Sequence, residues 1–109
     1  MSSAPTPRVR VPAQAKPGEL IEIKTLISHE MESGQRKDAA GKPLPRKIIN
    51  RFVVLANGRQ VLDTELFPSM AIDPYLIFKA RIDADTRFEM TWHEDGGASV
   101  SESAEVKVV

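Results

Sequence analysis

Apolar and polar residues alternate along much of this sequence, and that period of two limits the fold more than any other feature. The alternation is clearest in residues 75–82, 88–93 and 100–108, although Glu102 interrupts the apolar face of the last run. Successive side chains of a β-strand point to opposite faces of its sheet, whereas an amphipathic helix spaces its apolar residues three and four apart. No segment keeps the helical spacing over several turns. The pattern therefore predicts an all-β chain with half-buried strands.

Short turn signals separate seven such runs. Pro17-Gly18 suits a type II turn, and Asn57-Gly58 suits the type I′ turn of a hairpin, because both central residues of that turn need positive φ. The predicted strands cover residues 8–11, 20–27, 47–55, 60–66, 75–82, 88–93 and 100–108. Without crossover helices between them, they predict an immunoglobulin-like antiparallel β-sandwich of about seven strands, with a small barrel as the alternative.

The apolar faces of these runs define the predicted core. It takes either Leu20 or Ile21, and its other members are Ile23, Ile48, Phe52, Val54, Leu62, Leu76, Phe78, Ile82, Phe88, Met90, Trp92, Val106 and Val108. A chain of 109 residues can bury enough apolar surface to fold without a disulfide or a metal. We expect one domain over residues 8–109. Residues 1–7 are small and polar with two prolines, so we expect a disordered tail.

Several classes of protein are excluded or disfavoured by composition. The sequence has no cysteine, which excludes disulfides, thiolate metal sites and cysteine nucleophiles within this chain. It has no run of about 18 apolar residues that could form a membrane helix. Residues 1–7 lack the apolar segment of a signal peptide, so the sequence taken alone indicates a protein that stays where it is made.

Few residues suit catalysis, a metal or a nucleic acid. His29 lies in a Ser-His-Glu-Met-Glu run and His93 in a His-Glu-Asp run, but two histidines usually fall short of a first-row metal site. The sequence has neither a glycine-rich phosphate loop nor a nucleophile elbow. Aromatic residues make up only 6% and fit core positions rather than base-stacking positions. We expect no metal, no cofactor, no enzymatic activity and no nucleic-acid or membrane binding.

Charge is balanced over the chain but not along it. Residues 1–60 hold eleven Lys or Arg against five Asp or Glu, and residues 61–109 hold four against ten. Most of the positive excess lies in Gly34–Arg51. This segment is either a solvated loop that nearby carboxylates neutralise, or a one-signed contact surface for an acidic or anionic partner.

Two segments are unlike ordinary turns. Ser28–Arg46 is 19 residues of mostly polar chain, and connections longer than about 12–15 residues are usually functional or disordered. Phe67–Pro74 is an apolar segment with two prolines, which either plugs one end of the core or exposes Phe67, Met70 and Ile72 as an adhesive patch.

The predicted strand 47–55 is apolar on both faces. Ile49, Val53 and Leu55 lie opposite the face that carries Phe52, and Ile77 likewise points away from the predicted core. A second apolar face needs a cover, which is either another layer of this chain or another subunit. One hypothesis is therefore a binding module that self-associates through this strand.

Two linked runs carry a resemblance to a known family. The first is residues 27–38, Ile-Ser-His-Glu-Met-Glu-Ser-Gly-Gln-Arg-Lys-Asp, and the second is 41–52, Gly-Lys-Pro-Leu-Pro-Arg-Lys-Ile-Ile-Asn-Arg-Phe. They resemble the Z subunit of the SoxYZ thiosulfate-oxidation carrier. Asp73-Pro74-Tyr75 differs by one residue from the Asn-Pro-Tyr of that family. The similarity covers nearly the whole chain after Pro7.

The resemblance implies a non-catalytic, immunoglobulin-like subunit of a heterodimeric sulfur carrier. In that family the Y subunit carries the sulfur intermediate on a cysteine near its flexible C-terminus and presents it to the other periplasmic Sox enzymes. The resemblance also implies a periplasmic location, reached by export together with the Y subunit. The bare N-terminus is compatible with that route.

On this basis we expect two kinds of partner contact. Apolar residues of the strand faces, namely Ile49, Val53 and Ile77, would bury against the Y subunit in an interface larger than about 1,600 Å² in total. Arg36, Lys37 and Arg46 would offer cations to the anionic sulfur group, unless the arginines only anchor the loop through local carbonyls and Asp38. His29 and Met31 are further candidates for partner contact, with no chemistry assigned to them.

Overall fold

A computed structural model describes residues 6–67 and 73–109. Eight strands and no helix occur in these two ranges. The strands are β1 (Pro7–Arg10), β2 (Gln14–Ala15), β3 (Glu19–Ile27), β4 (Ile49–Ala56), β5 (Arg59–Glu65), β6 (Tyr75–Ile82), β7 (Thr86–Glu94) and β8 (Ser99–Val108). The described part of the chain contains no helix that could cross a membrane.

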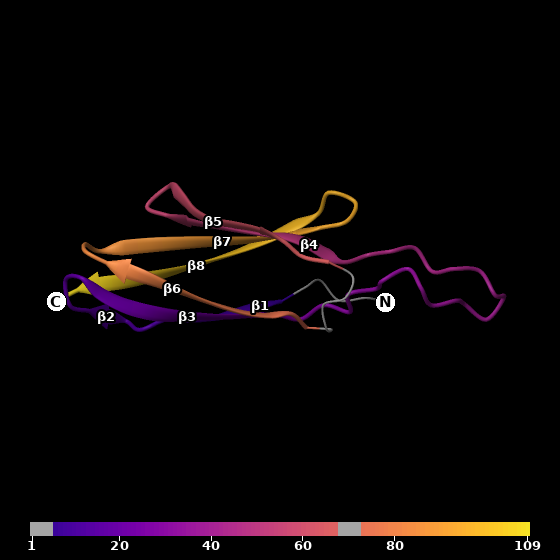
Figure 1. Cartoon of the computed structure of the whole chain (residues 1–109), viewed down its shortest axis with the longest axis horizontal. Helices are drawn as coiled ribbons and strands as arrows, with labels where there is room; N and C mark the ends of the chain where they lie inside the picture. Colours follow the sequence, from indigo (N-terminus) through magenta and orange to yellow (C-terminus); the bar gives the residue numbers. More distant parts are fainter. Residues whose placement is uncertain (1–5, 68–72) are drawn as a thin grey trace.

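The strands form two sheets that face each other across the core (Figure 1). The smaller sheet has the order β1-β3-β6, and the larger has the order β2-β8-β7-β4-β5. All pairings are antiparallel except the short parallel contact of β2 with β8. The predicted all-β sandwich is confirmed, and the seven predicted strands are present together with the additional two-residue β2.

The predicted turns have the backbone conformation that their sequences require. Asn57 has φ of 50° and Gly58 has φ of 82°, as a type I′ hairpin turn needs. The Asn57 side chain also ties this turn to the neighbouring one, because its Oδ1 accepts the Arg87 N–H at 2.9 Å and its Nδ2 donates to the Asp85 carbonyl at 3.1 Å. The β4–β5 hairpin is therefore fixed to the start of β7.

Aromatic rings form the centre of the core. The Phe52 and Trp92 centroids lie 4.9 Å apart, and Phe78 packs against Phe52 and Phe88 at 6.3 and 6.4 Å. Ile21 is the buried member of the Leu20/Ile21 pair, because Leu20 is 55% exposed. The other predicted core residues are buried or pack half-buried against the core, and the core further includes Ala15, Ile27, Met31, Ile49 and Leu66.

Ile49 lies inside the sandwich, so the expectation that it faces outward is wrong. The pairing of β4 with β7 shifts register between Ile49 and Arg51. This β-bulge interrupts the strict alternation, so that Ile48 and Ile49 are both fully buried. With no exposed surface in this chain, Ile49 is not available to a partner.

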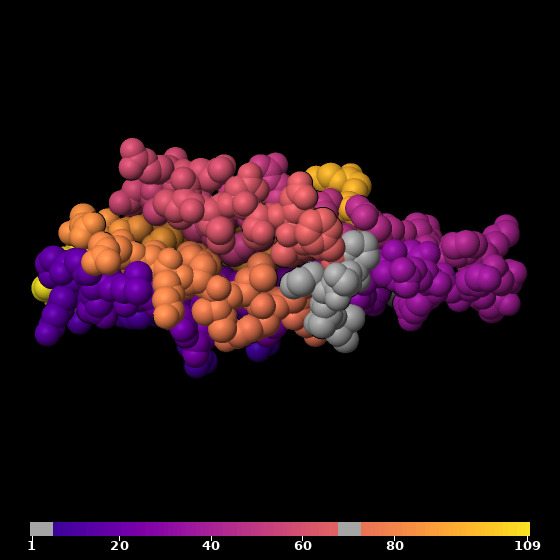
Figure 2. All heavy atoms as spheres, in the orientation of Figure 1, coloured from indigo at the N-terminus to yellow at the C-terminus, as the bar shows by residue number. Residues whose placement is uncertain are grey.

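The long segment between β3 and β4 folds back on itself as an ordered arm, defined here as residues 28–48. Glu32 and Lys47 exchange two backbone hydrogen bonds of 2.9 and 2.8 Å, and the Leu44 N–H donates to the Arg36 carbonyl at 2.8 Å. The arm extends away from the sandwich along the long axis of a molecule that measures 59 × 20 × 20 Å (Figures 1 and 2).

Only the ends of the other unusual segment and of the predicted tail are described. Phe67 is 59% exposed and Pro74 is buried, whereas Met70 and Ile72 lie outside the described residues. Most of the predicted tail also lies outside them; within it, Pro7 begins β1 and the Thr6 carbonyl accepts the Ser28 N–H at 3.1 Å.

Candidate functional site

The arm joins the sandwich at His29, whose ring bridges two elements. Its Nδ1 accepts the backbone N–H of Met31 at 2.8 Å, and its Nε2 lies 2.7 Å from Glu94 Oε2 at the end of β7. Because Nδ1 is an acceptor here, Nε2 carries the proton and donates it to the carboxylate. Both side chains are at most 10% exposed, so this hydrogen bond is protected from water.

Met31 occupies an unusual backbone conformation at the same junction. Its φ is 53°, a value that residues other than glycine adopt rarely. The Met31 side chain is buried, and its Sδ accepts the Ile49 N–H at 3.2 Å. His29 and Met31 were predicted as partner contacts. In this chain the side chains of both residues are buried, and both hold the arm against the core.

Asp95 anchors the part of the arm that leads into β4. Both of its carboxylate oxygens accept from the Arg46 guanidinium, at 2.8 and 2.9 Å. They also accept the Asn50 amide at 2.9 Å and the Ile48 N–H at 3.2 Å. The hydrogen bonds from the Arg46 side chain, followed by those from Asn50 and Ile48, hold the pKa of Asp95 below its ordinary value despite its partial burial.

Arg36 is held within the arm itself. Its Nε donates to Glu32 Oε1 at 2.9 Å, and its NH2 group contacts the same oxygen. This pairing lowers the pKa of Glu32 and raises that of Arg36. Asp38, the expected local partner, instead caps the turn by accepting the Ala40 and Lys42 N–H groups at 2.9 and 3.0 Å.

The three predicted cations of the arm therefore differ in their availability. Arg36 and Arg46 each engage a carboxylate, as the anchoring interpretation requires, although the carboxylates are Glu32 and Asp95. Lys37 is exposed, and no ion pair to it occurs among residues 6–67 and 73–109. Whether these residues contact a partner stays a prediction.

The remaining predicted contact residues lie on opposite sides of the molecule. Val53 is half-buried on the outer face of the five-stranded sheet, between Asp63 of β5 and Thr91 of β7. Ile77 is 50% exposed on the outer face of the three-stranded sheet, opposite Lys24. One flat partner surface cannot cover both residues.

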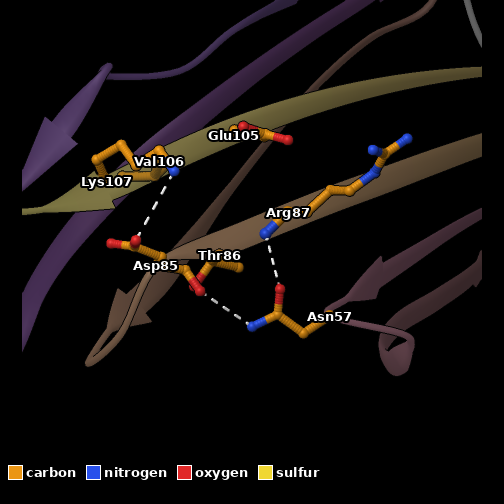
Figure 3. Close-up of a pocket in the computed structure, with 7 residues that line it drawn as sticks. All are labelled: Asn57, Asp85, Thr86, Arg87, Glu105, Val106 and Lys107. Atoms are coloured by element: carbon orange, nitrogen blue, oxygen red, sulfur yellow. Dashed lines mark hydrogen bonds and ion pairs between the residues drawn. The ribbon is translucent and has the colours of Figure 1, made fainter.

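Neither of two small hollows in the described part of the chain resembles a reaction site. The larger, of about 160 Å³, is lined by Asn57, Asp85, Thr86, Arg87, Glu105, Val106 and Lys107 (Figure 3). Its polar groups mainly fix turns: Asp85 accepts the Val108 N–H at 2.7 Å, and Asn57 makes the two bonds given above. The smaller, of about 50 Å³, borders Trp92, whose Nε1 has no hydrogen-bond partner in the described chain.

The two carboxylates that anchor the arm, Glu94 and Asp95, were not identified from the sequence. Glu94 ends β7 and Asp95 lies in the turn that follows, and their partners lie 65 and 49 residues away along the chain. Within the described residues, no group of three His, Asp or Glu side chains is placed to hold a metal ion. The only signal in the sequence for these anchors was the opposite net charge of residues 1–60 and residues 61–109.

Solved structures share this fold at low sequence identity. The sulfur carrier protein SoxY from Chlorobium limicola f thiosulfatophilum matches with a TM-score of 0.65 and 14% identity, over 94% of this chain and 74% of that one. A superoxide reductase (neelaredoxin) from Ignicoccus hospitalis, and its T24K form, each match with a TM-score of 0.67 and 14% identity, over 95% of this chain and 80% of the other. At this identity the likeness concerns the fold alone.

Comparison of sequences identifies the family. No curated protein matches this chain. The family described as sulphur oxidation protein SoxZ matches residues 9–105, which is nearly the whole sandwich together with the complete arm. The chain therefore belongs to the SoxZ family of sulfur-oxidation proteins, in agreement with the resemblance of residues 27–52.

Proposed function

We propose that this chain is the non-catalytic subunit of a two-chain sulfur carrier in thiosulfate oxidation. The observation that carries the proposal is a contrast: the chain belongs to a sulfur-oxidation family, yet it has no cysteine that could hold sulfur covalently. The reactive thiol then belongs to a second polypeptide, the Y subunit. The likeness of the fold to a sulfur carrier protein SoxY supports a partner of similar architecture.

The arm supports a role in positioning rather than in bond making. Its base is fixed by two carboxylates, Glu94 and Asp95, and its far end extends clear of the sandwich (Figure 2). A projecting element that is rigid at its base can guide a flexible segment of another chain. Lys37 and Lys42 near the far end are exposed and have no ion pair within the described residues, so they are the cations of the arm most available to an anionic sulfur group.

The two apolar contact candidates give the heterodimer contact a direct test. Because Val53 and Ile77 lie on opposite outer faces, replacing each in turn by aspartate tests the two faces separately. We expect one of the two variants to prevent association with the Y subunit while both remain folded. Since Val53 is half-buried, circular dichroism and thermal melting of each free variant are the control for its folding.

Co-expression with the cysteine-bearing chain tests the function itself. Native mass spectrometry should show a one-to-one complex, and exposure to thiosulfate and the oxidising enzymes should add mass to the partner alone. A cysteine-to-serine form of the partner should still assemble but gain no mass. Added mass on this chain, or failure to assemble, would contradict the proposal.

A self-associating module is the second candidate, and the exposed apolar residues favour it. Leu20, Tyr75 and Ile77 are each at least 50% exposed on one sheet. Sedimentation of the isolated chain decides between the two: a monomer that becomes a heterodimer supports the carrier role, and a stable homodimer that ignores the partner supports the module.

The proposal includes a periplasmic location, reached by export of the assembled pair with a signal on the partner. Fractionation of cells that express both chains, or this chain alone, tests this route. We expect this chain in the periplasm only when the partner with its signal is present. Periplasmic accumulation of this chain alone would overturn co-export.

The suggested electrostatic role of the arm is tested by Arg36→Ala combined with Lys37→Ala in the heterodimer. If these cations guide the anionic sulfur group, turnover by the oxidising enzymes falls at low salt and the difference shrinks at high salt, because salt screens exposed charges. Equal turnover at both salt concentrations would remove this role and leave Arg36 as an anchor only.

A further inference from the structure

The outer face of the three-stranded sheet concentrates positive charge that the sequence distributes over three distant segments. Its outward-pointing residues are Arg8 and Arg10 of β1, Leu20, Glu22, Lys24 and Leu26 of β3, and Tyr75, Ile77, Lys79 and Arg81 of β6. We call this surface the basic face. It holds five cations and a single carboxylate, Glu22, which lies 3.6 Å from Lys24.

Strand register places the apolar residues Leu26, Tyr75 and Ile77 together at one end of this face, beside the cations. Leu26 is paired with Arg8 on one side and Tyr75 on the other. Lys24 is likewise paired with Arg10 and with Ile77 in the next row. An apolar cluster that includes a tyrosine, with charges beside it, has the mixed composition of a protein interface.

The opposite face of the sandwich shows no such excess. The outward charged residues of the five-stranded sheet are Arg51, Asp63, Glu65, Arg87, Glu89, Glu105 and Lys107, three cations against four carboxylates. Arg51 pairs with Asp63, and Arg87 pairs with Glu89. A second copy of this chain therefore offers little free negative charge to the basic face, which disfavours self-association through it.

The size of the basic face argues for a transient contact. Three strands spaced by about 4.8 Å and eight residues at about 3.3 Å each give a face of roughly 400 Å². Stable complexes bury about 800 Å² on each partner, whereas weak encounters bury less. Exposed charges mainly accelerate and orient association and add less to permanent affinity.

We infer that the basic face is a docking surface for an acidic protein that visits the assembled carrier, namely an enzyme that loads or unloads the sulfur group. This inference rests on the proposed carrier role, because only a carrier has to meet such enzymes in turn. The inference places the positively charged contact surface on the three-stranded sheet. The charge pattern of the sequence pointed instead to Gly34–Arg51, but Arg36 and Arg46 of that segment are already paired with carboxylates.

Arg8→Glu combined with Arg10→Glu in the two-chain carrier tests the inference. Both side chains are exposed, neither has an ion pair within the described residues, and Arg10→Glu places a carboxylate opposite Lys24. The matched control is Arg59→Glu combined with Lys107→Glu, which makes the same change of net charge at exposed positions of the other sheet. Native mass spectrometry first establishes that both variants assemble. Ile77 of this face is also a candidate contact with the Y subunit, so loss of assembly by the Arg8/Arg10 variant alone would assign the basic face to that subunit and overturn the inference.

The measurement is KM for the carrier with each purified loading and unloading enzyme at low and high salt. With at least one enzyme, we expect the Arg8/Arg10 variant to raise KM roughly tenfold at low salt without changing kcat, because charge steering alters association rates by about 10–10³-fold. The difference should shrink at high salt, and the control should stay within about twofold.

Three further results would overturn the inference. An unchanged KM with every enzyme removes the docking role, and an equal effect of the control reduces it to net charge. Binding of the basic face to heparin or to phosphatidylserine vesicles, with unchanged enzyme kinetics, assigns it to a polyanion or a membrane instead. If the wild-type chains fail to assemble at all, the carrier role fails first, and the mass measurement shows this before any kinetics.

Discussion

Arg46 donates two hydrogen bonds to the two carboxylate oxygens of Asp95, at 2.8 and 2.9 Å, across 49 residues of chain. The same carboxylate accepts the Ile48 N–H and the Asn50 amide, so one side chain joins the arm, the start of β4 and the β7–β8 turn. Replacement of Asp95 by alanine should therefore affect more than one surface ion pair.

We expect Asp95→Ala to lower the free energy of unfolding by about 1–3 kcal/mol, the usual cost of leaving buried polar groups without an acceptor. Urea unfolding measures the change. Asp63→Ala is the matched control, because Asp63 also forms a bidentate pair, with Arg51, but accepts no backbone N–H among the described residues. Its loss should lower the free energy of unfolding clearly less. Equal losses in the two variants would show that Asp95 is an ordinary surface partner.

The lowered pKa of Asp95 gives its contribution a defined dependence on pH. A carboxyl whose pKa is lower in the folded than in the unfolded state stabilises the fold above its unfolded pKa of about 4, and this stabilisation is lost as pH falls. The difference in unfolding free energy between wild type and Asp95→Asn should be largest near neutral pH and shrink below about pH 4. A difference that is constant between pH 7 and pH 2 would contradict this.

His29 should be important for the order of the arm because both of its ring nitrogens are used. We expect His29→Ala to destabilise the protein by about 2 kcal/mol, since the Met31 N–H and Glu94 both lose a partner away from water. His29→Asn should recover part of the loss, because its amide oxygen can accept the Met31 N–H. Hydrogen exchange of that N–H distinguishes the variants, and equally fast exchange in both would argue against the assigned tautomer.

Two glycines of the arm separate backbone strain from steric contact. Gly34 and Gly41 have φ of 86° and 81°, but a Cβ at Gly34 would lie 3.2 Å from Arg46 Cβ, whereas a Cβ at Gly41 meets nothing within 4 Å. Alanine at either position costs about 1–2 kcal/mol for the positive φ. Gly34→Ala should cost more and speed hydrogen exchange at the Lys47 N–H, and identical exchange in the two variants would exclude the close contact.

Phe78 and Ile77 are adjacent on β6, and their replacement compares a core position with a surface position of the same strand. Its ring contacts Phe52 and Phe88, and we expect Phe78→Ala to cost about 3 kcal/mol through the cavity it leaves. Ile77→Ala, on the exposed side of the same strand, should change stability by less than about 0.5 kcal/mol. A loss below about 1 kcal/mol for Phe78→Ala would mean that the ring contributes little to the packing.

The strands were predictable because alternation and turn residues are local properties of the chain. Asn57-Gly58 determined a hairpin, and Phe52, Trp92 and Val106 were recognisable as core from their neighbours alone. Ile49 was misplaced because its bulge arises from pairing with β7, which is distant in sequence.

The anchors of the arm were hidden for the same reason. Glu94 and Asp95 find their partners only when β7 lies beside β4, so their neighbours in the sequence do not reveal them. The basic face is equally non-local, because β1, β3 and β6 each supply only part of its charge. Its outline depends on strand order rather than on any single motif.

The reciprocal hydrogen bonds between Glu32 and Lys47 close the arm near its base, ahead of the tip that Asp38 caps. Residues 39 and 40 are exposed at the tip, so a short epitope or a fluorophore-bearing peptide inserted between them would be displayed beyond the sandwich. Such an insertion opens the Asp38 cap, but we expect the Glu32–Lys47 closure to keep strand register intact. A label at this position would report on contacts between the arm and other proteins.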